Sequence, residues 1–230
     1  MRSRWRSPAG VLALAGILLG SGVLGFLVYR VAPQPKTVSK IVSAAPPVTD
    51  AAPPPASHPI PETLPDISLP DVNGDPHRLA DWAGSPLIVN FWATWCEPCR
   101  REIPLLEGLY RENPRTAFEI VGIAIDHLDS VVKYARQMKI DYPILVGEKG
   151  GLEAAAAFAM EPVLPFTVFA DAQGRIVTLK IGELHRDEAA FILARLADIR
   201  SGRLSLPAAR EQIDAAMRRL AVSRAAAGAE

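Results

Sequence analysis

Two continuous apolar runs, residues 86–92 and 118–125, stand out in the middle of the chain. Runs of this length without polar alternation are typical of strands that are buried on both faces of a sheet. The segment 166–181 indicates two further strands, and the short turn around 171–174 makes that pair antiparallel. A shorter apolar run at 143–147 predicts one more strand.

Segments with helical periodicity lie between and after these runs. They cover four ranges of the sequence, namely about 97–111, 129–139, 151–160 and 187–200. We expect Asp129 to cap the second of these helices, and the last begins with acidic residues and ends with arginine, as the helix dipole favours. The alternation of strands and helices predicts an α/β fold with a central mixed β-sheet flanked by helices.

Two additions flank this core. The pair Asn73-Gly74 lies between short apolar segments and predicts an N-terminal β-hairpin. In the last segment, 201–230, the residues Ile213, Met217 and Leu220 fall on one face, which predicts a C-terminal helical extension.

The start of the chain has arginines at positions 2, 4 and 6, followed by an uncharged run from Ala9 to Tyr29. As a helix rising ~1.5 Å per residue, this run spans roughly the ~30 Å hydrocarbon core of a bilayer. A cleaved signal peptide is the alternative, but its apolar region is usually only about 7–15 residues long. No A-x-A-like cleavage site directly follows Tyr29, so we expect an uncleaved anchor with a cytoplasmic N-terminus.

Residues 31–61 are rich in Pro, Ala, Ser and Thr and show no sustained apolar period. Such a segment cannot bury enough surface to offset its chain entropy, so we expect a flexible linker. The expected organisation is a cytoplasmic N-terminus and transmembrane anchor at 1–30, this linker, a folded domain at 62–200 and a helical tail at 201–230. The folded domain would then lie in a compartment where disulfides persist.

The charge of the chain does not indicate a polyanionic partner. Its 25 Lys and Arg residues balance 25 Asp and Glu residues, and the formal net charge is zero. We therefore expect no interaction with nucleic acid.

The chain has only two cysteines, and Cys96 and Cys99 stand three positions apart. A structural disulfide between them would close a very short loop and constrain little of the unfolded chain. Both lie where the strand ending near Trp92 turns into the helix starting around Glu97, which is where sites form in α/β sheets. At a helix N-terminus, unpaired N–H groups and the dipole favour the thiolate, which is the reactive form of cysteine.

This arrangement predicts thiol–disulfide exchange. Cys96 is the expected nucleophile, and Cys99, one helical turn further and more shielded, would resolve the mixed disulfide. Pro98 fits the first helical turn, where its missing N–H costs nothing. We expect Trp95 to form an aromatic rim beside the sulfurs, whereas core packing is the simpler interpretation of Trp92.

The stretch NFWATWCEPCRREIP resembles the thioredoxin superfamily, and specifically its membrane-anchored, exported TlpA/ResA/CcmG-like branch. The likeness covers about residues 62–200 and includes the hairpin, the W-C-x-P-C motif and VLPFTVFADAQGRI downstream. The resemblance implies a thioredoxin-like fold and a cis peptide bond between Leu164 and Pro165, facing the cysteines. Backbone exposed near Leu164 would then pair with a substrate segment as an added strand.

Two further positions separate the branches of this superfamily. Thioredoxins place a buried aspartate six residues before the first cysteine, but Asn90 stands there and cannot titrate. The TlpA/ResA-like branch carries a glutamate three residues after the second cysteine, and this residue is Glu102. The resemblance assigns Glu102 to proton transfer at Cys99, whereas the alternative is that it only complements the helix dipole.

The resemblance also implies a location and partners. It indicates a single-pass protein of the inner (cytoplasmic) membrane whose C-terminal domain lies in the periplasm and reduces disulfides of exported proteins. The implied substrates are apocytochrome c or copper-centre assembly proteins, and the implied electron donor is a transmembrane thiol carrier of the DsbD/CcdA kind. Glu97 favours the reducing direction because its charge opposes a neighbouring thiolate. We expect no cofactor.

A tethered binding module without turnover is one alternative, but the intact cysteine pair argues against it. Two further functions compete with this interpretation. Copper binding and delivery is one, but Cys-x-x-Cys supplies only half of a typical four-ligand metal site, and His127 is the only placed histidine candidate. A thiol peroxidase is the other, but such enzymes use a Thr-x-x-Cys setting, and Thr94 is two residues before Cys96 rather than three. We expect no metal site.

Overall fold

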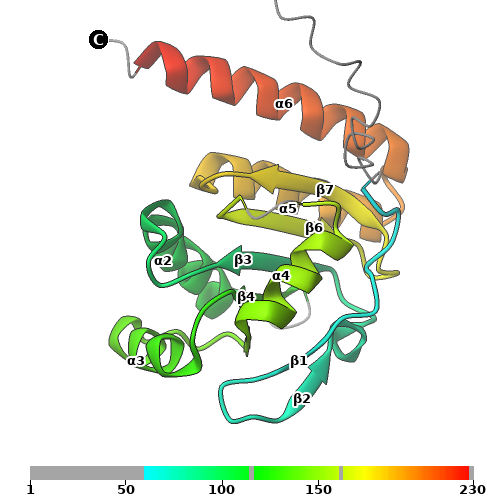
Figure 1. Cartoon of the computed structure of the whole chain (residues 1–230). Helices are drawn as coiled ribbons and strands as arrows, with labels where there is room; N and C mark the ends of the chain where they lie inside the picture. Colours follow the sequence, from blue (N-terminus) through cyan, green and yellow to red (C-terminus); the bar gives the residue numbers. More distant parts are fainter. Residues whose placement is uncertain (1–59, 114–116, 161–162, 228–230) are drawn as a thin grey trace, which may run out of the picture. The chain divides into compact units, whose positions relative to one another are not determined.

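The computed structural model describes residues 60–113, 117–160 and 163–227 (Figure 1). The expected anchor at 1–30 and nearly all of the expected linker at 31–61 lie outside these residues. Within the described ranges, none of the helices is long and apolar enough to cross a membrane.

The elements alternate much as the hydrophobic pattern predicts. The strands are β1 (Ser68–Pro70), β2 (Pro76–Arg78), β3 (Leu87–Trp92), β4 (Glu119–Ala124), β5 (Ile144–Val146), β6 (Phe166–Ala170) and β7 (Ile176–Ile181). The helices are the 3-10 helix η1 (Leu79–Trp82) and the α-helices α2 (Glu97–Glu112), α3 (Leu128–Met138), α4 (Glu148–Ala157), α5 (Arg186–Arg200) and α6 (Leu206–Ala227).

Five of these strands form one mixed sheet in the order β5-β4-β3-β6-β7. Figure 1 labels β4, β3, β6 and β7 among them. β3 pairs in parallel with β4, and β4 in parallel with β5, whereas β6 runs antiparallel to both β3 and β7. The α/β fold with a central mixed sheet flanked by helices is therefore confirmed. β3 lies in the middle of the sheet, so the segment that follows it emerges at the centre of the sheet edge.

Successive residues of β3 point to opposite faces of the sheet and feed two hydrophobic clusters. Ile88 and Trp92 belong to the cluster that α2, α3 and α5 cover. Leu87, Val89 and Phe91 belong to the cluster on the other face, which α4 and the N-terminal hairpin cover. Burial on both faces explains why this strand has no polar alternation apart from Asn90, which shares the face of Ile88 and Trp92.

The hairpin expected at Asn73-Gly74 is present as the antiparallel pair β1–β2. Asp71 stabilises its turn, because Asp71 Oδ1 accepts hydrogen bonds from the backbone N–H groups of Asn73 (2.8 Å) and Asp75 (2.9 Å). Gly74 has φ +92°, a conformation that residues with a Cβ rarely adopt.

The expected cap of α3 is wrong. The helix begins at Leu128 with His127 at the N-cap position, and Asp129 lies inside the first turn. An acidic residue in the first turn still complements the helix dipole, but it does not cap the helix.

The expected C-terminal helix is α6, which packs against α5 and β7. Ala209, Ile213 and Ala216 are buried in this contact, and Met217 packs against the same hydrophobic cluster. Because it buries an apolar face against the domain, α6 is part of the folded unit.

Candidate active site

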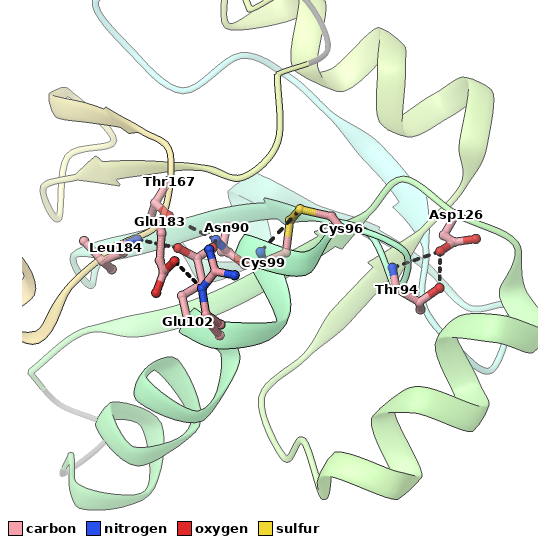
Figure 2. Close-up of a disulfide and its surroundings, with 10 residues drawn as sticks. Asn90, Thr94, Cys96, Cys99, Glu102, Asp126, Thr167, Glu183 and Leu184 are labelled. Atoms are coloured by element: carbon pink, nitrogen blue, oxygen red, sulfur yellow. Dashed lines mark hydrogen bonds and ion pairs between the residues drawn. A yellow bond between two sulfur atoms is a disulfide. The ribbon is translucent and has the colours of Figure 1, made fainter. Parts of the chain in front are cut away.

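The two cysteines form a disulfide at the junction of β3 and α2 (Figure 2). Cys96 is the N-cap residue of α2, and its Sγ accepts the backbone N–H of Cys99 at 3.3 Å. Pro98 lies in the first turn, where no N–H is needed. The helix N-terminus therefore donates directly to the sulfur that would carry the thiolate charge after reduction.

The surroundings of the two sulfurs differ. Cys99 is 0% exposed, Cys96 is 5% exposed, and the neighbouring Trp95 is 70% exposed. Trp92 is completely buried and lies against Tyr134 with a ring-centroid distance of 5.7 Å. An incoming disulfide can therefore approach Cys96 beside the Trp95 ring, while Cys99 stays covered. This geometry fits the expected roles of nucleophile and resolving cysteine.

The turn that leads into Cys96 is held by Asp126, which follows β4. Asp126 Oδ2 accepts the backbone N–H of Thr94 at 2.9 Å and its hydroxyl at 2.5 Å. Its Oδ1 accepts the N–H of His127 at 2.7 Å. Because β3 and β4 are parallel neighbours, their carboxyl ends meet at one edge of the sheet. Asp126 was not among the residues predicted from the sequence, although its position directly after the second buried strand was the available signal.

Glu102 lies on α2 one helical turn after Cys99 and is only 1% exposed. Its Oε1 accepts the side-chain amide of Asn90 at 2.7 Å, and its Oε2 accepts the backbone N–H of Leu184 at 2.6 Å. Figure 2 shows this group on the opposite side of the disulfide from Asp126. Leu184 was also not predicted from the sequence, because it contributes its backbone N–H and not its side chain.

Burial raises the pKa of Glu102 from 4.5 to about 7. The hydrogen bonds from Leu184 and Asn90 and the positive charge of Lys180 oppose this rise in pKa, and the negative charge of Glu183 adds to it. A carboxyl group that gains and loses a proton near neutral pH, one turn from Cys99, is suited to general acid–base chemistry.

Asn90 orients this carboxyl group. Its Nδ2 donates to Glu102 and also, at 3.0 Å, to Thr167 Oγ1 on the neighbouring strand β6. Asn90 and Thr167 are both fully buried. The position that holds a titrating aspartate in thioredoxins therefore holds a fixed hydrogen-bond donor to Glu102.

The expected substrate-binding segment lies at the same edge of the sheet. The peptide bond between Leu164 and Pro165 is cis, as the resemblance implied. Because Phe166 pairs with Phe91, Pro165 lies beside the end of β3. Leu164 packs against the hydrophobic cluster that includes both cysteines, and Val163 before it is exposed.

Charged side chains surround the entrance to the site. Arg101 donates to Glu183 at 2.7 Å and to Glu97 at 3.1 Å. The Glu97 side chain is 85% exposed, so this ion pair is screened by solvent. The same screening weakens the effect of the Glu97 charge on a thiolate at Cys96.

The residues that were considered for the competing functions have other partners. His127 Nδ1 lies 2.8 Å from Glu148 Oε2. Across 60–113, 117–160 and 163–227, no group of three His, Cys, Asp or Glu side chains is placed to hold a metal ion. The hydroxyl of Thr94 is bonded to Asp126.

Similar proteins share this fold and chemistry. Residues 60–179 match the model of the AhpC/TSA family. The thiol-disulfide oxidoreductase ResA of Geobacillus kaustophilus is 32% identical over 127 residues, which are 55% of this chain and 71% of that protein. ResA of Bacillus thuringiensis subsp. konkukian is 29% identical over 133 residues, covering 57% of this chain and 75% of that protein.

Solved structures agree with these relatives. A secreted thiol-disulfide isomerase from Corynebacterium glutamicum superimposes with a TM-score of 0.54 at 26% identity, covering 59% of this chain and 85% of that one. A thioredoxin-family thiol:disulfide interchange protein from Chlorobium tepidum gives a TM-score of 0.50 at 30% identity, covering 55% and 90%.

The fold, the cysteine pair and these similarities define a thiol–disulfide oxidoreductase with a thioredoxin-like fold. Within that class the chain belongs to the AhpC/TSA family, whose model matches more than half of its length. It is of the ResA type among the oxidoreductases of this fold.

Proposed function

We propose that this protein reduces disulfide bonds in exported proteins, working from an anchor in the inner membrane with its folded domain in the periplasm. The observation that carries the proposal is the buried carboxyl group of Glu102, one turn from Cys99 in the Cys96–Cys99 site. The similarity to ResA-type oxidoreductases supports the class of reaction. The apolar run at 9–29 and the arginines before it support the anchor and its orientation.

In the proposed first step, the thiolate of Cys96 attacks one sulfur of a substrate disulfide. The substrate S–S bond breaks, a mixed disulfide forms with Cys96, and the released substrate thiolate takes up a proton. The N–H of Cys99 that already donates to Cys96 Sγ stabilises the thiolate before the attack.

In the second step, the thiol of Cys99 gives its proton to the carboxylate of Glu102 and attacks Cys96 Sγ. The mixed disulfide breaks, the Cys96–Cys99 disulfide forms, and the second substrate sulfur leaves as a thiolate that Glu102 protonates. Two electrons pass from the cysteine pair to the substrate. A carboxyl group with a pKa of about 7 can take and return this proton near neutral pH.

Substrate binding is assigned to the surface around Cys96. The exposed ring of Trp95 and the side chains of Glu97 and Pro98 flank the sulfur, and the segment Leu164–Pro165 offers backbone to an extended substrate segment. Candidate substrates are the haem-site cysteines of apocytochrome c and the cysteines of copper-centre assembly proteins. A transmembrane thiol carrier of the DsbD/CcdA kind would reduce the pair again.

Trapping of mixed disulfides tests this proposal. In the full-length chain, Cys99→Ala removes the resolving sulfur, so Cys96 should accumulate covalent complexes with exported proteins that dithiothreitol releases. The matched control Cys96→Ala keeps one cysteine but removes the nucleophile, and it should trap none. Equal trapping by both variants, or trapping only by Cys96→Ala, would contradict the proposed roles. Mass spectrometry of the released partners separates the two substrate classes.

A further inference from the structure

The C-terminal helix α6 ends in contact with the N-terminus of α5. In its last turn, Arg224 Nη1 lies 2.8 Å from Glu188 Oε1, and Nη2 lies 2.8 Å from Asp187 Oδ1. Both α5 and α6 lie outside residues 60–179, which match the family. The ion pairs therefore join two helices that both lie beyond the family match.

Glu188 is 1% exposed and has three partners. Its Oε1 is shared by Arg224 and by Lys180 Nζ, which lies at 3.2 Å. Its Oε2 accepts the backbone N–H of His185 at 3.0 Å, which caps the start of α5. A buried carboxylate needs such partners, and removing one of them leaves a charge that is costly to bury.

Lys180 links Glu188 to the active-site carboxyl group. In the sheet, Asn90 pairs with Thr167, and Thr167 pairs with Lys180, so the three residues form one row across β3, β6 and β7. Asn90 donates to both Thr167 and Glu102. The positive charge of Lys180 also lowers the pKa of Glu102, so Lys180 acts on both buried carboxylates.

The loop before α5 forms a second link. Two consecutive backbone N–H groups in this loop donate hydrogen bonds to the two carboxylates. Leu184 donates to Glu102, and His185 donates to Glu188. Holding Glu188 in place therefore also holds the N–H of Leu184 against Glu102.

We propose that Arg224 is a positioning residue for proton transfer at Glu102, acting through Glu188, Lys180 and the Leu184–His185 backbone. The inference rests on the proposed role of Glu102. It adds α6 to the elements that determine the pKa of Glu102. Arg224 neutralises part of the charge of Glu188, so the ammonium group of Lys180 is attracted less strongly to Glu188 and can also stabilise the carboxylate of Glu102.

The direction of the effect follows from the charges around Glu102. Without Arg224, Lys180 is drawn toward the unbalanced Glu188, and the N–H of Leu184 is held less firmly. Both changes disfavour the Glu102 carboxylate, so its pKa rises. The other groups that face Glu102 are Asn90, Glu183 with its partner Arg101, and the buried Tyr142, and the substitution leaves all of them in place.

The test is a carbon-13 NMR titration of the Glu102 carboxyl in the full-length oxidised chain, with the resonance assigned by its loss in Glu102→Gln. We expect Arg224→Gln to raise the midpoint by about half a pH unit or more. Arg224→Lys, which keeps the charge, should restore most of the wild-type value. The control is Arg210→Gln at the other end of α6, where Arg210 binds Glu62 and the carbonyl of Ile176, and it should leave the midpoint unchanged.

Glu188→Gln gives an independent test with the opposite sign. It removes the charge that competes for Lys180, so the pKa of Glu102 should fall below the wild-type value. A merely structural role of Arg224 predicts that loosening admits water and lowers the pKa of Glu102 toward 4.5. An unchanged or lowered midpoint in Arg224→Gln, or an equal rise in Arg210→Gln, would overturn the proposal.

The same variants separate this inference from the proposed function. If Glu102→Gln leaves the pH profile of disulfide reduction unchanged, the catalytic role of Glu102 fails, although the titration can still show the coupling. If Glu102→Gln abolishes an ionisation near pH 7 while Arg224→Gln shifts nothing, the catalytic role stands and the role of Arg224 fails.

Discussion

At the scale of single residues, the chemistry of this protein depends on where one carboxyl group lies. The helical spacing puts Glu102 one turn from Cys99, and tertiary contacts bury it and give it two hydrogen-bond donors. Burial raises the pKa of Glu102 more than these two hydrogen bonds lower it, and the net change is from 4.5 to about 7. The same shift that suits proton transfer must then cost stability where the group is ionised.

Stability should therefore depend on the protonation of Glu102. Between pH 4.5 and about 7 the folded state binds this proton more tightly than the unfolded state, so stability falls as pH rises through that window. The difference in pKa corresponds to roughly 3 kcal/mol in the free energy of unfolding. Urea unfolding of the oxidised protein at several pH values should show that Glu102→Gln lacks this loss. A wild-type-minus-variant difference that stays constant with pH would contradict it.

At the scale of elements, the turn between β3 and α2 presents Cys96, and a residue from another element fixes that turn. Asp126 accepts two hydrogen bonds from Thr94 and one from His127. The pair of parallel strands brings Asp126 there, because β3 and β4 end at the same edge of the sheet.

Asp126→Ala should leave the backbone N–H groups of Thr94 and His127 without their acceptor, at a cost of about 1 kcal/mol for each of these part-buried hydrogen bonds. We expect a lower free energy of unfolding and a several-fold slower attack of reduced Cys96 on a model disulfide, measured by stopped-flow fluorescence. Asp129→Ala is the matched control, because this acidic side chain lies only in the first turn of α3. A rate equal to that of the control would contradict the role of Asp126.

The sequence predicts those elements whose buried residues follow a regular pattern along the segment. β3 and β4 were found because burial on both faces leaves a nearly continuous apolar run, and α2 because its buried residues recur at helical spacing. The cap of α3 was misplaced, because a cap is decided by backbone geometry at one residue.

The same contrast holds for the site. Cys96 and Cys99 were found from their spacing at a strand-to-helix junction, and Glu102 was assigned by the family resemblance, which relies on its position three residues after Cys99. Asp126 and the N–H of Leu184 reach the site from positions 32 and 82 residues away from their partners. A backbone donor also leaves no signature in the pattern of side chains, so only the fold reveals Leu184.

At the scale of the whole molecule, the C-terminal helix behaves as part of the domain. Ile213 on α6 is 0% exposed, whereas Val222 on the same helix is 70% exposed. Ile213→Ala should lower the free energy of unfolding by about 2–5 kcal/mol in a single transition, and Val222→Ala should change it by less than about 0.5 kcal/mol. Chemical denaturation followed by circular dichroism measures both. A separate early transition for α6 would show that it is not part of the domain.

The proposed function depends on the direction in which the cysteine pair passes electrons. The most direct test is the reduction potential of the full-length chain, measured by tryptophan fluorescence in dithiothreitol buffers, because Trp92 and Trp95 adjoin the pair. A protein that reduces disulfides in an oxidising compartment should have a potential near or below that of thioredoxin, about −270 mV. A potential near that of DsbA, about −120 mV, would make the protein an oxidant and contradict the proposed function.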